Sequence, residues 1–126
     1  MMETSTTQEA PQPMMKASTT QEVLQRLSET LLSRRHADPD KSYTAKLFAD
    51  GPDSILKKIG EESAELIMAG KEGNRLHVVW EATDVVYHTM VLLAFYGLTI
   101  EDVFQEMRRR EGISGIDEKR SRTAAK

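Results

Sequence analysis

Four acidic residues at helical spacing are the side chains in this sequence best suited to chemistry. Glu62 and Glu65 lie three residues apart, and so do Glu81 and Asp84. Residues three or four apart share one face of an α-helix, so each pair can present two carboxylates together. The chain has no cysteine, and a site with oxygen ligands only selects hard cations such as Mg²⁺ or Mn²⁺. The pattern predicts a divalent metal site, with Mg²⁺ as the first choice.

The position of Glu62 supports this interpretation, because this residue interrupts an apolar stripe. At 100° per residue, Ile59 and Leu66 lie about one turn before and after Glu62 on the same helix face. Glu61 lies further from the stripe. An ionised carboxylate on a buried stripe loses several kcal/mol of hydration unless it gains a partner. A metal ion would be such a partner.

The second acidic pair interrupts a segment, residues 76–95, that is apolar around most of its circumference. Glu81, Asp84 and His88 form a narrow polar seam on it. Antiparallel packing would place this seam opposite the first pair, and four carboxylates in a low-dielectric interior repel one another unless cations lie between them. Carboxylate-bound Mg²⁺ usually keeps water ligands and accepts phosphate oxygens, so the pattern indicates phosphoanhydride chemistry.

Simpler interpretations exist for several of these residues. Either acidic pair alone is more typical of a solvated helix surface. His88 is more typical of a hydrogen-bonded core histidine, or of a residue that supports Asp84, than of a metal ligand. Lys58 and Lys71 fit a solvated surface as well as a phosphate contact. Residues 108–110, three arginines, favour the negative end of a helix dipole over a binding site.

The hydrophobic periodicity predicts an all-α fold with four helices and no strand. Capping residues, Pro52 and paired glycines set the expected bounds, which are Thr20 to Arg35, about Asp53 to Gly70, Asn74 to Gly97, and Thr99 to about Arg110. The connection from 36 to 52 is expected to hold a short helical turn around residues 45–48.

Three segments are expected along the chain. Residues 1–17 are rich in Thr, Gln, Pro and Met and are expected to form a disordered tail. Residues 18–113 form the helical domain, and residues 114–126 are expected to form an irregular C-terminal tail. A chain of 126 residues is the size of one ordinary domain.

Composition argues against several other classes of protein. The net charge of −3 gives no electrostatic case for a nucleic-acid partner. Residues 85–98 form the longest apolar stretch, which is shorter than the roughly 20 residues of a membrane span and is expected to be a core helix. No secretory signal is visible, and the absence of cysteine fits a reducing cytoplasm.

Three segments resemble a known family. They are SYTAKLFADGPDSILKKIGEESAELIMAGKEGN at 42–74, EATDVVYHTMVLLAFYGLTIEDVFQEMRRR at 81–110 and GISGIDEK at 112–119. Together they resemble the phosphoribosyl-ATP pyrophosphatases of histidine biosynthesis, which are MazG-like all-α nucleotide pyrophosphohydrolases. The pattern E-E-x-x-E followed by E-x-x-D is common to that superfamily, whereas SYTAKLF, KKIGEE and D-x-x-Y-H narrow the resemblance to this family.

The resemblance implies a MazG-like four-helix bundle completed by a second copy, with a homodimer expected and a tetramer as the alternative. It implies Mg²⁺-activated attack of water between the α and β phosphates of phosphoribosyl-ATP, giving phosphoribosyl-AMP and pyrophosphate. By position, the residues that match the family's magnesium ligands are Glu62, Glu65, Glu81 and Asp84. Glu61 and Glu62 are the expected catalytic residues, and the expected phosphate contacts are Lys46, Lys58 and Lys71.

Two other functions are compatible with the same residues. A house-cleaning hydrolase of nucleoside triphosphates would use the same metal site on a different substrate. A non-catalytic helical dimerisation module would carry the acidic seam without using it.

Overall fold

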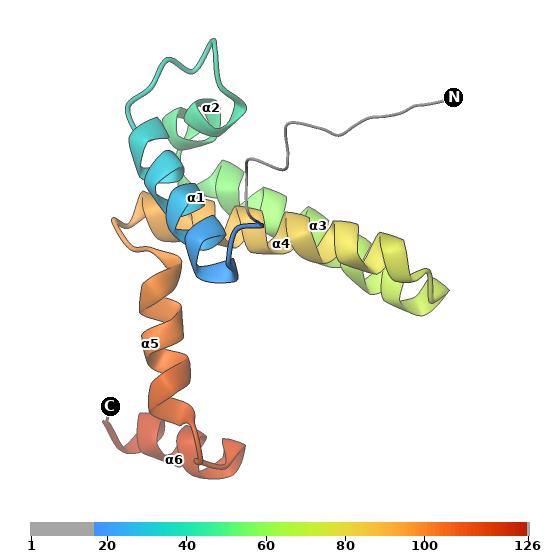
Figure 1. Cartoon of the computed structure of the whole chain (residues 1–126), viewed down its shortest axis with the longest axis vertical. Coiled ribbons are helices and arrows are strands. Elements are labelled where there is room, and N and C mark those ends of the chain that lie inside the picture. Colours follow the sequence, from blue (N-terminus) through green and yellow to red (C-terminus); the bar gives the residue numbers. More distant parts are fainter. Residues whose placement is uncertain (1–16, 126) are drawn as a thin grey trace.

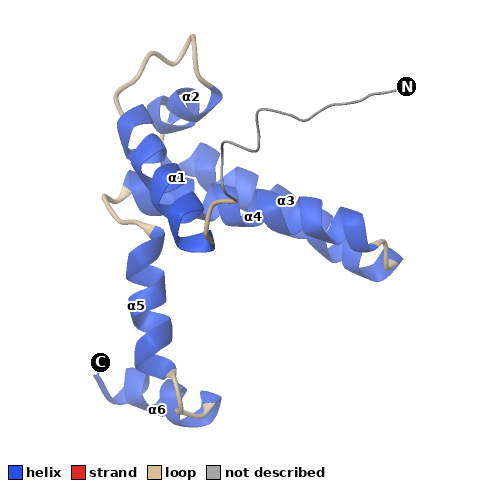
Figure 2. Cartoon of the chain, in the orientation of Figure 1, coloured by secondary structure: helices blue, strands red, loops and turns tan. Residues whose placement is uncertain are grey.

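The computed structural model describes residues 17–125. In this range the chain forms six α-helices and no strand (Figure 2). The helices are α1 (Thr20–Arg34), α2 (Tyr43–Asp50), α3 (Pro52–Glu72), α4 (Arg75–Phe95), α5 (Ile100–Arg110) and α6 (Gly115–Ala125). The all-α prediction is confirmed, with two helices more than the four expected. The expected N-terminal tail lies, except for residue 17, outside the described residues.

The long helices α3 and α4 form an antiparallel hairpin (Figure 1). α3 ends where Gly73 adopts a left-handed backbone, φ 78°, and its N–H donates to the Ala69 carbonyl at 3.1 Å. α4 begins directly afterwards, because the Asn74 side chain accepts from the His77 N–H at 3.1 Å. The predicted helix stop and start at this link are confirmed, and α3 runs two residues beyond Gly70.

The hydrophobic core lies at one end of the hairpin, where α1 and α2 pack against the first turns of α3 and the second half of α4. Its buried residues are Leu31, Leu47, Phe48, Ile55, Met90, Val91 and Ala94. The rest of the hairpin extends away from this core (Figure 1). The core therefore fixes the orientation of α3 against α4, and the hairpin carries that orientation to the acidic residues in its middle.

The short helical turn expected around residues 45–48 is a complete two-turn helix, α2. Ser42 caps it by accepting from the Ala45 N–H at 3.1 Å, and Leu47 and Phe48 are buried in the core. The extra residues become helical because these tertiary contacts stabilise a helix too short to be stable alone.

Capping boxes begin α1 and α5; the box of α1 and the Thr99 cap of α5 were predicted. Thr19 and Glu22 exchange hydrogen bonds at the start of α1, and Thr99 and Asp102 do so at the start of α5. α5 then leaves the core in a different direction from the hairpin, with α6 at its far end (Figure 1). None of the residues of α5 is buried in the single chain.

The expectation of an irregular segment after residue 114 is wrong, because residues 115–125 form α6. Ser114 accepts from the Asp117 N–H at 3.1 Å at its start. Glu118, only 4% exposed, forms ion pairs with Arg109, Arg110 and Arg122. Two of these arginines belong to α5, so the contacts that hold α6 are not visible in its own hydrophobic pattern. The boundaries of the 18–113 domain stay a prediction.

The tip of the hairpin exposes a large apolar surface. We call it the hairpin-tip surface, and it consists of Ile67, Met68, Leu76, Val79 and Trp80, each more than half exposed. By length and composition α4 could cross a membrane, and only 22% of its apolar window is buried. A membrane span and a helix covered by another protein chain share these properties.

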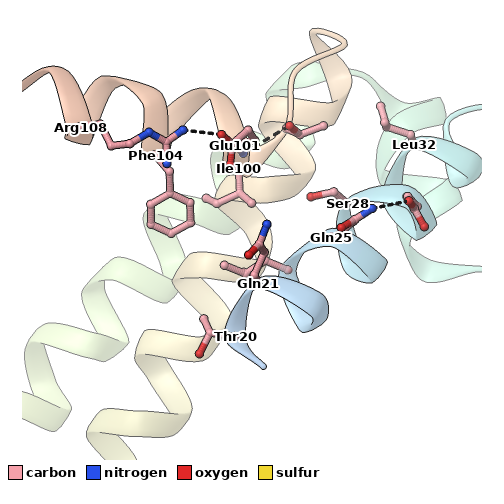
Figure 3. Close-up of a pocket in the computed structure, with 12 residues that line it drawn as sticks. Thr20, Gln21, Gln25, Ser28, Leu32, Ile100, Glu101, Phe104 and Arg108 are labelled. Atoms are coloured by element: carbon pink, nitrogen blue, oxygen red, sulfur yellow. Dashed lines mark hydrogen bonds and ion pairs between the residues drawn. The ribbon is translucent and has the colours of Figure 1, made fainter. Parts of the chain in front are cut away.

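A pocket of about 630 Å³ lies where α5 diverges from α1. Leu24, Ser28, Ile100 and Phe104 are among the residues that line it, and an Arg108–Glu101 ion pair lies at one side (Figure 3). The four acidic candidates do not line this pocket.

Candidate active site

Carboxylates from α3 and α4 meet in the middle of the hairpin. Glu62, Glu81 and Asp84 each offer one oxygen atom, and these three atoms lie within 4.8 Å of one another. Glu62 comes from α3 and the other two come from α4. The prediction that antiparallel packing brings the polar seam of α4 opposite α3 is confirmed, and the group has the composition and spacing to hold a metal ion.

Glu62 is buried because it lies on the inward face of α3. It follows Ile55 by seven residues and precedes Ala69 by seven, and all three are buried. Glu62 is 8% exposed, and within residues 17–125 its Oε1 atom has no hydrogen-bond partner; Oε1 of Glu81 is in the same condition. Buried carboxylate oxygens without partners are costly. A divalent cation would satisfy both, so the donor set fits a metal.

Glu65 lies on the exposed side of α3, beside Glu81 but outside the group of three oxygen atoms. The pKa of Glu81 is raised above its ordinary value, first by desolvation, then by the adjacent Glu65 carboxyl, and then by repulsion from Asp84 and Glu62. Burial and the neighbouring carboxylates therefore make it harder for Glu81 to carry a charge. A bound cation would reverse this effect. We define the acidic cluster as Glu62, Glu65, Glu81 and Asp84.

Lys58 lies one turn before Glu62 on α3 and provides a positive charge at the edge of the acidic cluster. Its Nζ atom is 3.4 Å from Glu61 Oε1 and 3.4 Å from Glu62 Oε2. The pKa of Lys58 is raised, and the largest cause is the nearby Tyr43 phenol, followed by burial in the opposite direction and by the two glutamates. Glu61 is half-exposed, outside the acidic cluster.

His88 is buried and hydrogen-bonded at both ring nitrogens. Nδ1 is 2.9 Å from the Asp84 carbonyl oxygen, and Nε2 is 3.0 Å from the Tyr43 hydroxyl. A carbonyl can only accept, so Nδ1 carries the proton; in the neutral ring Nε2 must then accept from Tyr43. This arrangement matches the prediction that His88 is a hydrogen-bonded core residue, and it links α2 to the backbone of Asp84.

Tyr43 was not among the site residues expected from the sequence. Its hydroxyl reaches His88 from α2, and burial is the largest cause of the raised pKa of Tyr43, while the charge of Lys58 lowers it. The available signal was the Ser42 cap, which fixes the first turn of α2 and so the place of Tyr43.

The other two candidate lysines have no recorded contact with the acidic cluster. Lys46 forms an ion pair with Asp50 of its own helix at 3.2 Å, and its side chain is 65% exposed. Lys71 is exposed in the last turn of α3. Their roles in phosphate binding stay predictions.

Comparison with known proteins places these residues in a family. The sequence profile described as phosphoribosyl-ATP pyrophosphohydrolase matches residues 24–111, which include all four residues of the acidic cluster. The chain belongs to this family. The resemblance found from the sequence motifs is thereby confirmed.

Individual members of the phosphoribosyl-ATP pyrophosphohydrolase family agree with the profile. The phosphoribosyl-ATP pyrophosphatase of Dechloromonas aromatica is 80% identical over 103 residues, which are 82% of this chain and 95% of the relative. That of Aromatoleum aromaticum is 57% identical over 104 residues, or 82% and 96% of the two chains. That of Geobacter sulfurreducens is 50% identical over 101 residues, or 80% and 94%.

Proposed function

We propose that this chain hydrolyses phosphoribosyl-ATP to phosphoribosyl-AMP and pyrophosphate, the second step of histidine biosynthesis. The names of its relatives support the substrate. The observation that carries the chemistry is the buried Glu62, which has a partnerless Oε1 and offers one oxygen to a group of three carboxylate oxygens within 4.8 Å. A biosynthetic nucleotide as substrate favours the cytoplasm as the place of action.

In this proposal the acidic cluster holds Mg²⁺, with Mn²⁺ as a substitute. A divalent metal bound there would supply positive charge for the phosphate oxygens and would lower the pKa of a water ligand toward neutrality. Bound Mg²⁺ would also offset the mutual repulsion that raises the pKa of Glu81.

The side chains of the protein orient the water, accept its proton and bind the phosphate oxygens. The water oxygen bonds to the α phosphorus, while the bond from that phosphorus to the bridging oxygen breaks and pyrophosphate leaves with the electron pair. Glu61, half-exposed beside the acidic cluster, orients the water and accepts its proton. Lys58 lies close enough to the acidic cluster to bind a phosphate oxygen, and Lys46 and Lys71 are weaker candidates for that role.

We also propose that the chain works as a homodimer, with a tetramer as the alternative. The hairpin-tip surface and the unburied α5 support this, because a second copy would cover apolar side chains that the single chain leaves in water. Coverage by a second copy also accounts for the apolar composition of α4 without a membrane.

A pyrophosphate-release assay tests the function. Phosphoribosyl-ATP is offered to the wild type, to Glu62→Gln and to the control Glu72→Gln, which alters an exposed glutamate at the end of α3. With Mg²⁺ present, we expect turnover in the wild type and the control. Glu62→Gln should lose at least about a hundredfold, since even residues that only support metal ligands account for 10–100-fold. A chelator should abolish turnover in all three.

Two outcomes would contradict the proposal. Rapid Mg²⁺-dependent pyrophosphate release from deoxynucleoside triphosphates, with none from phosphoribosyl-ATP, would identify a house-cleaning hydrolase. No turnover of any nucleotide, combined with a Glu62→Gln variant as stable as the wild type or more so, would identify a helical dimerisation module.

A further inference from the structure

Lys58 occupies a position that the metal chemistry of the acidic cluster does not require. Its ammonium lies 3.4 Å from an oxygen of Glu62 and 3.4 Å from an oxygen of Glu61. In the part of the chain that the structure describes, no other lysine or arginine forms an ion pair with the acidic cluster. One cationic side chain is therefore built into the anionic site.

The two oxygens of Glu62 have different surroundings. Oε2 faces the Lys58 ammonium, whereas Oε1 is buried without a partner among residues 17–125. A divalent cation bound by Glu62 would lie close to that ammonium. Two cations on one carboxylate repel each other, and water around the partly exposed Lys58 side chain weakens this repulsion without removing it.

Tyr43 offers the ammonium a second position. The hydroxyl proton of Tyr43 is directed to His88 Nε2, because His88 Nδ1 donates to the Asp84 carbonyl. The oxygen of Tyr43 is thus left as an acceptor, and the Tyr43 phenol is the largest cause of the raised pKa of Lys58. His88 thereby orients the acceptor toward which Lys58 can move.

We propose that Lys58 is a displaceable counter-ion of the metal centre. In the metal-free protein its ammonium neutralises Glu62 and limits repulsion within the acidic cluster. A divalent cation drives it from Glu62 toward Tyr43 and Glu61, where it is free to meet a phosphate oxygen of the substrate. This inference rests on the proposed function, because it requires that the acidic cluster binds a divalent cation.

The inference predicts the direction in which a substitution of Lys58 changes the affinity for the metal. If Lys58 and the metal compete for Glu62, each weakens the binding of the other by the same factor. Removing the ammonium must then strengthen metal binding. A lysine that merely supports the shape of the site would, when replaced, leave metal affinity unchanged or weaken it.

Binding of Mn²⁺ to the full chain tests the direction of this change in affinity. Calorimetry and the electron paramagnetic resonance signal of the free ion measure the binding. We expect Lys58→Gln to bind Mn²⁺ about three- to tenfold more tightly than the wild type, as expected for one unit charge removed from a few ångströms away. Lys58→Arg keeps the competing charge and should bind like the wild type. The exposed neighbour Lys57→Gln is the control and should also bind like the wild type.

Thermal unfolding provides a second measurement on the same variants. In a chelator, Lys58→Gln should unfold at a lower temperature than Lys57→Gln, because the acidic cluster has lost its counter-ion. With saturating Mn²⁺ this difference should shrink or reverse.

The possible failures can be told apart. Unchanged or weaker Mn²⁺ binding in Lys58→Gln, while wild type binds and Glu62→Gln does not, overturns the counter-ion role and leaves the metal site intact. If wild type binds no Mn²⁺ and Glu62→Gln behaves identically, the metal site itself is wrong, and the inference falls with it.

Discussion

Glu62 illustrates how a residue can be present for its chemistry although it does not suit the packing around it. Its neighbours on the same face of α3, Ile55 and Ala69, are buried apolar residues, so an aliphatic side chain would suit the position better for stability alone. The carboxylate is tolerated because Lys58 neutralises one of its oxygens in the metal-free protein and because, in our proposal, a divalent cation takes over from Lys58 when it binds. A residue that fits its packing environment poorly is therefore informative about function.

The hydrogen bond between Tyr43 and His88 is the second feature at this scale, and it can be tested alone. Tyr43→Phe leaves the Nε2 atom of the buried His88 without its donor, which should lower the free energy of unfolding by about 1 kcal/mol. Urea denaturation measures the change. Tyr96→Phe, which removes a hydroxyl from an exposed tyrosine, is the control and should change stability by less than about 0.5 kcal/mol. Equal effects in both variants would show that the bond contributes nothing.

At the scale of helices, local signals predicted most boundaries. Thr19, Asn74 and Thr99 cap the helices that their positions indicated, and Gly73 ends α3. The convergence of Glu62 with the seam of α4 was also predictable, because helical periodicity and an antiparallel hairpin determine it.

Contacts between helices were not predictable in the same way. α6 depends on the pairing of Glu118 with arginines of α5, and Tyr43 reaches His88 across 45 positions of sequence. Neither contact has a periodic signal in the sequence. The sequence of α5 also does not indicate that this helix diverges from the core, because its caps and its apolar residues would suit a packed helix.

Ion pairs at the end of α5 predict a dependence on pH. Glu106 pairs with Arg109 and Arg110 of its own helix, and both arginines also pair with Glu118 of α6. Hydrogen bonds from Arg109 and then Arg110 lower the pKa of Glu106 to about 2. A lowered carboxyl pKa means that the interaction stabilises the folded state above the ordinary value of about 4.5 and is lost as the pH falls toward 2. The backbone amide resonances of α6 should stay constant from pH 7 to 5 and shift below that range.

The variant Glu106→Gln distinguishes the loss of the Glu106 ion pairs from general unfolding of the protein in acid. The variant should show altered α6 resonances already at pH 7, while the resonances of α3 and α4 match the wild type. If the α6 resonances of wild type and variant coincide at every pH, Glu106 does not help to hold α6.

At the scale of the whole molecule, the chain is an open arrangement with more apolar surface than its own helices cover. The core occupies one end of the hairpin, and the hairpin-tip surface and the part of α5 beyond Ile100 both lie outside it (Figure 1). The pocket between α1 and α5 has apolar residues on both sides (Figure 3). A second copy packed against the chain would account for all of these uncovered apolar surfaces.

A charged substitution at the hairpin tip tests this association. Val79→Asp places a carboxylate in the hairpin-tip surface and should shift the chain from dimer to monomer, with a fall in stability of about 2 kcal/mol or more from the lost apolar burial. Sedimentation velocity gives the mass. Lys41→Asp, on the exposed connection between α1 and α2, is the control and should remain dimeric. A dimeric Val79→Asp, or a monomeric wild type, would exclude this surface as the interface.

The absence of buried residues in α5 has a consequence for how the molecule reaches its final form. A helix of 11 residues is too short to persist in water without tertiary support, and α6 is anchored on α5. Residues 100–125 would then become fully ordered only on meeting another chain. Refolding should accordingly slow on dilution, with its last phase following second-order kinetics, so that protein concentration governs how quickly the mature structure is attained.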